Sequence, residues 1–129
     1  MRVLIFVMVS ALFFLVACNK EAGRGGTSSI YGKLHVYEVN GLGDTLDDYD
    51  AMDEDVYIIY GDADKTYDDK FACSYDGSFR FDYLTPGTYT LFAYSRCDTC
   101  DDEQKPIFKT VEITEDKTEY EVSGFGILK

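Results

Sequence analysis

The stretch that decides the fold is DGSFRFDYLTPGTYTL, residues 76–91. It opens with Asp76-Gly77, two residues that tolerate the positive φ of a tight hairpin turn. The next seven residues alternate, with Phe79 and Phe81 on one side, as the residues of a half-buried strand do. Thr85-Pro86-Gly87-Thr88 then has the Pro and Gly of a type II turn. The stretch therefore predicts a turn, a strand, a second turn and the start of another strand.

Strand patterns continue on both sides of this stretch. Alternating, β-branched and aromatic residues predict six further strands, at residues 30–37, 55–60, 70–75, 89–96, 107–113 and 118–127. No segment after residue 29 has the period of a helix. Seven short strands with regular turns predict an all-β fold, a single β-sandwich over residues 30–129 that is large enough to fold alone.

The deciding stretch also resembles a family signature. Residues 76–91 match the pattern D-G-x-F-x-F-x-x-L-x-P-G-x-Y-x-L of carboxypeptidase-regulatory-like and Cna-B-type domains. The resemblance implies a prealbumin-like (Ig-like), seven-stranded Greek-key sandwich, and it implies no catalytic site. The family usually has a short first loop, whereas residues 40–55 are long and acidic here. Some Cna-B domains form an internal Lys–Asn bond. Lys33 could supply the Lys, but residues 118–129 contain no Asn, so we expect no cross-link.

The first residues have the pattern of an export signal. Met1-Arg2 gives a positive start, and the apolar residues 3–16 are shorter than the ~20 residues of a membrane span. They end in Leu15-Val16-Ala17-Cys18, which resembles the lipobox of bacterial lipoproteins. The resemblance implies that residues 1–17 are removed and that Cys18 becomes an acylated N-terminus, which palmitate would label. The alternatives are an ordinary signal peptide with a chance Cys and an N-terminal membrane helix.

The residues after Cys18 bear on location. Lipoproteins kept in the inner membrane of Gram-negative bacteria often carry Asp at the position of Asn19. The resemblance therefore favours export to the outer membrane, with the domain facing the periplasm or the cell surface. Residues 18–29 are rich in Gly, Ser and Thr, which predicts a flexible linker after the lipidated cysteine. The membrane is then one expected partner, reached through the lipid anchor.

Charge and histidine content exclude some functions. The chain has 24 acidic and 12 basic residues and a formal net charge of −12. Nucleic acid is excluded as a partner, because phosphate binding needs a basic face. His35 is the only histidine, and its parity places it on the outer face of the first strand, which favours an exposed strand residue over a general base. We expect no enzyme activity, and hydrolase activity is a remote alternative that rests only on abundant carboxylates.

Three cysteines remain after Cys18, and an exported protein favours a disulfide among them. Cys97 and Cys100 have redox spacing but lack the strand-then-helix context of thioredoxin, and their acidic neighbours would raise their thiol pKa values. A structural disulfide is the better interpretation. A Cys97–Cys100 pair and a link from Cys73 to either of them both stay open, with one thiol left free.

Acidic residues concentrate in two loops, which would leave the same end of a sandwich whose strands run up and down in order. Such an acidic pole is either a solvated cap or a site for Ca²⁺, which takes roughly six to eight oxygen ligands. The spacing does not match the EF-hand loop, and no other cofactor is expected. The candidate metal ligands are Asp44, Asp47, Asp48, Asp50, Asp53, Asp55, Asp98, Asp101 and Asp102.

Tyrosines on the predicted strands offer a second kind of surface. Tyr31, Tyr37, Tyr57 and Tyr94 would face outwards, where Tyr either covers a sheet or stacks on sugars and partner proteins. The sequence therefore predicts a membrane-anchored, non-catalytic sandwich that acts as an adhesion, scaffold or accessory-binding module for a protein or glycan. The alternative is a carbohydrate- or Ca²⁺-binding accessory protein that uses the acidic pole or the Tyr face.

Overall fold

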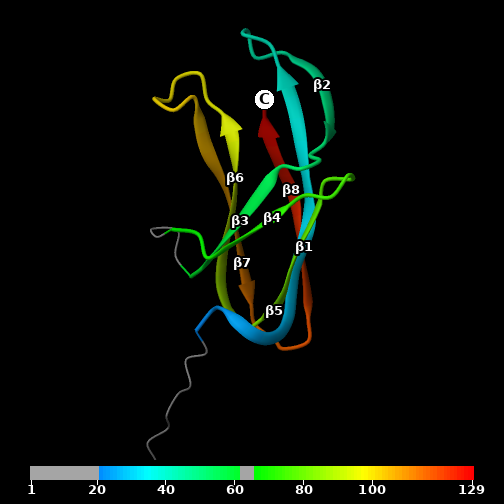
Figure 1. The fold of residues 1–129 in the computed structure, drawn as a ribbon, viewed down its shortest axis with the longest axis vertical. Helices are drawn as coiled ribbons and strands as arrows, with labels where there is room; N and C mark the ends of the chain where they lie inside the picture. The colour runs from blue at the N-terminus through cyan, green and yellow to red at the C-terminus, as the bar shows by residue number, and fades with distance from the viewer. Residues whose placement is uncertain (1–20, 62–65) are drawn as a thin grey trace, which may run out of the picture.

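A computed structural model describes residues 21–61 and 66–129, and these residues form an all-β structure (Figure 1). The predicted signal peptide and Cys18 lie outside the described residues, so their role stays a prediction. In the part of the chain that the structure describes, no helix is long and apolar enough to cross a membrane. The prediction of an all-β fold is confirmed for these residues.

The strands form two sheets of four. Sheet A contains β1 (Arg24–Val39), β2 (Thr45–Asp50), β5 (Ser78–Leu84) and β8 (Glu119–Leu128). Sheet B has the order β4 (Asp69–Ala72), β3 (Asp55–Tyr60), β6 (Gly87–Arg96), β7 (Gln104–Ile113). The long strand β1 organises sheet A, because β5 and then β2 pair with one of its edges and β8 pairs with the other, in parallel.

One apolar core lies between the two sheets. Sheet A contributes side chains from β1, β5 and β8, and sheet B contributes side chains from β3, β6 and β7. Phe79 and Phe81, predicted to share one side of a strand, are both buried in this core. The largest fully buried side chain is that of Tyr89 on β6. Burial of this many apolar side chains is the main force that holds sheet on sheet.

The structure has an eighth strand that the sequence did not predict. Residues 40–55 were expected to be a loop, but β2 lies within them and pairs with the end of β1. All six residues of β2 are exposed. A strand that buries neither face has no apolar alternation, so the period-two pattern that marks the other strands is missing.

Two turns join the expected strands, but the strands that each turn joins lie in different sheets. Asp76-Gly77 was predicted to close a hairpin, yet it leads from β4 in sheet B to β5 in sheet A. Pro86-Gly87 likewise leads from β5 back to sheet B. Gly77 has a φ of 74° and its carbonyl accepts a 2.9 Å hydrogen bond from the backbone of Leu34. These residues reverse the chain as predicted, but at each turn the chain passes from one sheet to the other.

The prediction of a flexible linker over residues 18–29 is wrong for the residues from 21 onward, which the structure describes. Residues from Arg24 onward belong to β1, and both Ser28 and Ser29 are buried. The backbone of Gly23 accepts a 2.9 Å hydrogen bond from Thr85. A Cβ on Gly26 would lie 2.0 Å from the carbonyl oxygen of Leu84. The small residues here permit close packing of two backbones rather than flexibility.

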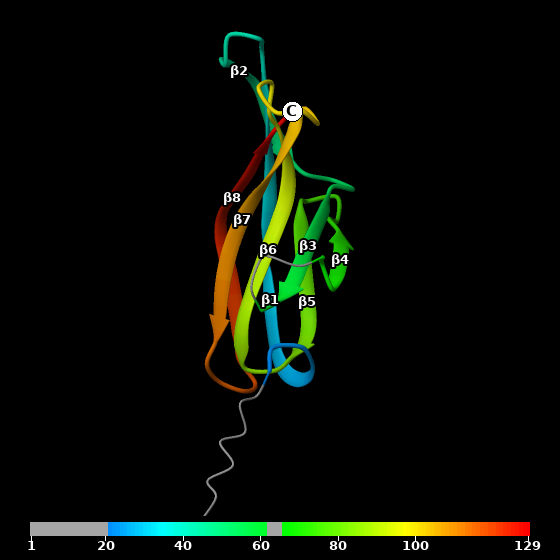
Figure 2. The same ribbon diagram turned by 90° about the vertical axis from the view of Figure 1, so that its left-hand side faces the viewer.

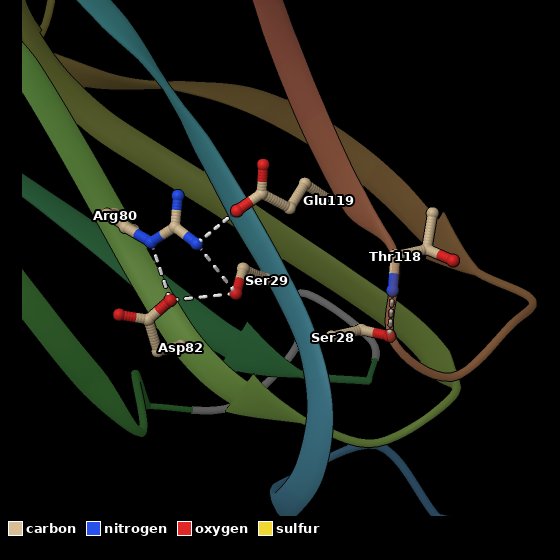
Figure 3. Close-up of polar contacts among 6 residues, drawn as sticks. All are labelled: Ser28, Ser29, Arg80, Asp82, Thr118 and Glu119. Atoms are coloured by element: carbon tan, nitrogen blue, oxygen red, sulfur yellow. Dashed lines mark hydrogen bonds and ion pairs between the residues drawn. The ribbon is translucent and has the colours of Figure 1, made fainter.

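Polar side chains tie the three main strands of sheet A together on its outer face (Figure 3). Arg80 on β5 donates to Asp82 at 2.6 Å and to Glu119 on β8 at 2.5 Å. Ser29 on β1 lies between them and donates to Asp82 at 2.7 Å. A neighbouring serine, Ser28, bridges β1 to the turn before β8. Together these contacts fix the register of β1 against β5 and β8.

Candidate binding face

Aromatic side chains gather on the outer face of sheet B. Along β6 the core takes Leu91 and Ala93, so alternation points Phe92 and Tyr94 outwards. Figure 2 shows β3, β6 and β7 side by side, which brings the outward rings of neighbouring strands together. We call this cluster the aromatic platform; it consists of Tyr57, Tyr67, Phe92, Tyr94 and Phe108.

The platform has a buried centre and an exposed rim. Phe92 stacks on Tyr57 with ring centroids 4.8 Å apart and an angle of 11° between the planes, and Phe92 is 7% exposed. Phe108, 5.7 Å from Phe92, is 49% exposed, while Tyr94 is 42% and Tyr67 is 44% exposed. Rings that pack on one another hold their positions, so the exposed faces form a preorganised apolar surface.

A polar pocket opens beside the platform. Its volume is about 400 Å³, and Tyr57 and Tyr94 form part of its wall. The connection before β3 and the connection between β6 and β7 also line it, and both connections carry acidic residues. In Figures 1 and 2 the β6–β7 connection lies at the same end of the molecule as the C-terminus. The platform and the pocket share two tyrosines, so they form one continuous candidate site.

The carboxylates of the pocket fall into two groups. Glu54 pairs with Lys129 at 2.8 Å, and Asp55 pairs with Lys70 at 3.0 Å. Among the described residues, none forms an ion pair with the other three acidic side chains that line the pocket, which are those of Asp53, Asp102 and Glu103. Arg96 also lines the pocket, but its guanidinium is paired with Asp98 at 2.6 Å. The pocket therefore carries uncompensated negative charge.

Local backbone structure fixes two of these carboxylates. Asp53 and Glu103 have φ values of 62° and 56°, which L-residues rarely adopt. The backbone of Asp53 donates a 3.0 Å hydrogen bond to Cys73, and that of Glu103 donates one of the same length to Cys100. Both acidic residues are therefore held by hydrogen bonds at the positions where they line the pocket.

Of the disulfide pairings that the sequence left open, the structure has Cys97–Cys100, with 5.4 Å between the Cα atoms. This disulfide lies within the β6–β7 connection, which also carries Asp102 and Glu103 of the pocket wall. Cys73 is a free, buried thiol. Burial, helped by the nearby carboxylates Glu54 and Asp55, raises the pKa of the Cys73 thiol to about 12.

The nine predicted metal ligands do not converge on one point. Asp53, Asp55 and Asp102 line the pocket. The described residues contain no group of three or more His, Cys, Asp or Glu side chains placed to hold a metal ion. The other carboxylates have local partners or face solvent: Asp44 contacts Asn40, Asp47 caps a backbone amide, Asp48 and Asp50 contact His35, Asp98 pairs with Arg96, and Asp101 is exposed.

His35 and the four predicted tyrosines lie on both outer faces. His35 contacts Asp48 at 2.7 Å, and no hydroxyl or thiol among the described residues hydrogen-bonds to its ring. Tyr31 and Tyr37 lie on β1 in sheet A, whereas Tyr57 and Tyr94 lie in sheet B. The four tyrosines therefore form no single face.

Three platform residues were missed from the sequence. Phe92 and Phe108 have the parity of outward residues on their strands, and this signal could have found them. Tyr67 lies before β4, outside any strand, and no pattern pointed to it.

Burial raises the pKa of the Tyr57 phenol, and Asp55 adds to that effect. The hydroxyl in the pocket wall is therefore neutral at physiological pH.

Comparison with known proteins bears on the fold. No family model matches the sequence, and no curated protein matches it. A proposed carbohydrate-binding protein from Pseudomonas aeruginosa has a similar structure, with a TM-score of 0.51 and 15% identity over 84% of this chain and 92% of that one. The structure of (S)-allantoin synthase matches more loosely, with a TM-score of 0.39 and 14% identity over 81% of this chain and 42% of that one. At 15% identity, the similarity to the protein from Pseudomonas aeruginosa concerns the fold alone.

Proposed function

We propose that this chain is an exported, lipid-anchored protein that binds glycans without catalysing a reaction. Acylated Cys18 would hold it on the outer membrane of a Gram-negative bacterium. Its domain would be a prealbumin-like, Greek-key sandwich of the carboxypeptidase-regulatory-like or Cna-B type. The binding site would be the aromatic platform together with the polar pocket beside it.

The observation that carries this proposal is the aromatic platform. The exposed rings on adjacent strands offer aromatic faces of the kind on which the C–H face of a sugar ring packs. Phe92 is held between Tyr57 and Phe108, so the surface is already ordered before a ligand arrives. Little ordering entropy is then lost on binding, which favours a platform of this kind over a mobile loop.

The pocket supplies the polar half of a sugar site. Sugars need hydrogen-bond donors and acceptors at the edge of an apolar surface. The pocket wall contains Gln104 and the carboxylates of Asp102 and Glu103, next to Tyr94. The similar fold of the proposed carbohydrate-binding protein from Pseudomonas aeruginosa is compatible with this role. Of the binding roles open from the sequence, a glycan ligand therefore has the most support.

A glycan array probed with the full-length chain in detergent micelles tests the proposal. We expect binding to a subset of glycans, and we expect the double variant Tyr94→Ala, Phe108→Ala to lose at least about tenfold in affinity for that subset, because two stacking surfaces are removed. The matched control is Tyr49→Ala, Tyr75→Ala, two exposed tyrosines that lie outside the platform. Binding to no glycan, or an equal loss in both double variants, contradicts the proposal.

A further inference from the structure

The platform and the uncompensated carboxylates meet at Tyr94. This ring belongs to the platform and also lines the pocket, together with acidic residues from both connections. The pocket wall contains five carboxylates and two cationic groups. Both cationic groups are already neutralised, Arg96 by Asp98 and Lys129 by Glu54. A ligand in this pocket therefore meets negative charge and aromatic faces at the same time.

These two features attract the same chemical group. The face of an aromatic ring carries negative electrostatic potential and attracts an ammonium group within about 6 Å. The carboxylates of Asp53, Asp102 and Glu103 attract it as well, and they repel an anionic ligand. The net charge of −12 acts in the same direction over longer distances, because it raises the rate at which cationic ligands arrive.

We infer that the site selects glycans that carry free amino groups, with the ammonium held between Tyr94 and the unpaired carboxylates and the sugar ring on the platform. This inference rests on the proposed function and narrows its ligand class to amino sugars. Neutral sugars would contact the same platform and pocket without the ammonium group and would bind less tightly. Sugars with carboxylate or sulfate groups would be excluded by the charge of the pocket.

Chitosan hexamer and chitin hexamer separate these cases, because they share one backbone and differ only in N-acetylation of the amine. We would measure the affinity of both for the full-length chain by calorimetry at about pH 6 in low salt. Polygalacturonate serves as the anionic glycan and polylysine as the cation without sugar. We expect chitosan to bind about three- to tenfold more tightly than chitin, a preference that shrinks in high salt.

Charge-neutral variants locate the preference. Asp102→Asn, Glu103→Gln should weaken chitosan binding to about the affinity of chitin and should weaken chitin binding far less, because the amides keep their hydrogen-bonding capacity and lose only the charge. The charge-matched control Glu38→Gln, Glu121→Gln removes two exposed carboxylates of sheet A outside the pocket and should preserve the preference. The variant Tyr94→Ala should weaken the binding of both oligosaccharides.

The possible results distinguish the two proposals. Equal affinity for chitosan and chitin, or the same loss in both charge variants, overturns the selection of amines and leaves glycan binding intact. Polylysine binding that equals chitosan binding and ignores Tyr94→Ala overturns the inference as well, because charge alone then explains it. Failure of every oligosaccharide to bind overturns the proposed function and, with it, this inference.

Discussion

Asp82 shows how a single side chain links strands that are distant in the sequence. Its carboxylate accepts hydrogen bonds from Ser29 and Arg80, and these two contacts hold the pKa of Asp82 below its usual range, the hydrogen bond from Ser29 most of all. Arg80 in turn reaches Glu119 on β8. This network could not be predicted from the sequence, because Ser29, Arg80 and Glu119 lie on three strands whose pairing was unknown.

A depressed pKa in the folded state makes stability depend on pH. The ionised form of Asp82 stabilises the fold above the pKa of the unfolded chain, about 3.9, and this contribution is lost as pH falls through the lower folded pKa. We expect Asp82→Asn to lower the free energy of unfolding at pH 7 by about 1 kcal/mol or less, because the groups are well exposed to solvent.

Urea denaturation of both proteins across the acid range measures this effect. The difference between wild type and Asp82→Asn should shrink below about pH 3.9, where Asp82 is protonated in the unfolded chain. Asp101→Asn, at an exposed site on the β6–β7 connection, is the control and should match wild type throughout. A difference that stays constant with pH would mean that the carboxylate charge plays no part.

Turns and strands differ in how well the sequence predicted them. Strand β3 and strand β5 begin and end at the predicted residues, because burial on one or both faces imposes a clear pattern. The turn at Asp76-Gly77 was also placed correctly, but its strands lie in different sheets. Local residue chemistry determines where the chain reverses, whereas the partner of each strand depends on contacts between distant residues.

The candidate site follows the same division. Tyr57 and Tyr94 were predicted to face outwards, and they do so on one sheet. They lie next to Phe108 and the acidic connections because the sheet has the order β3-β6-β7. No local sequence pattern predicts that order. Strand β2 was missed for another reason, since all of its side chains are exposed.

Two glycines test what the turn before β5 requires. Gly77 and Gly43 both have positive φ, at 74° and 87°, but a Cβ would lie 2.5 Å from the carbonyl oxygen of Leu34 at Gly77 and within 4 Å of nothing at Gly43. We expect Gly43→Ala to cost about 1–2 kcal/mol through its conformation alone. Gly77→Ala should cost about 1–3 kcal/mol more, since the backbone must shift.

Chemical denaturation of the two variants measures both losses in the free energy of unfolding under one set of conditions. The comparison isolates the steric effect because the conformational cost is shared. Similar losses in the two variants would show that the crossing between sheets tolerates a side chain at Gly77. Gly43, in the connection between β1 and β2, lies away from the core.

The proposed lipid anchor makes a prediction for the whole molecule. If the lipobox resemblance holds, cells fed labelled palmitate should yield a labelled protein that fractionates with membranes, because acyl chains at one cysteine anchor a protein stably. Cys18→Ser should abolish the label and release the protein from the membrane fraction. Cys73→Ser, which removes the free thiol inside the domain, should keep the label. Label on the Cys18→Ser protein would exclude this site of acylation.

The two ends of the sandwich differ in what they present. Strand β1 begins at one end, and the β6–β7 connection beside the pocket lies at the other (Figures 1 and 2). The ten residues of β6 separate these ends by about 30 Å at the usual rise of a strand. In a chain anchored in the membrane through the proposed lipid on Cys18, the pocket would therefore lie at the end of the domain far from the lipid. Polysaccharides too bulky to approach a bilayer would remain within its reach.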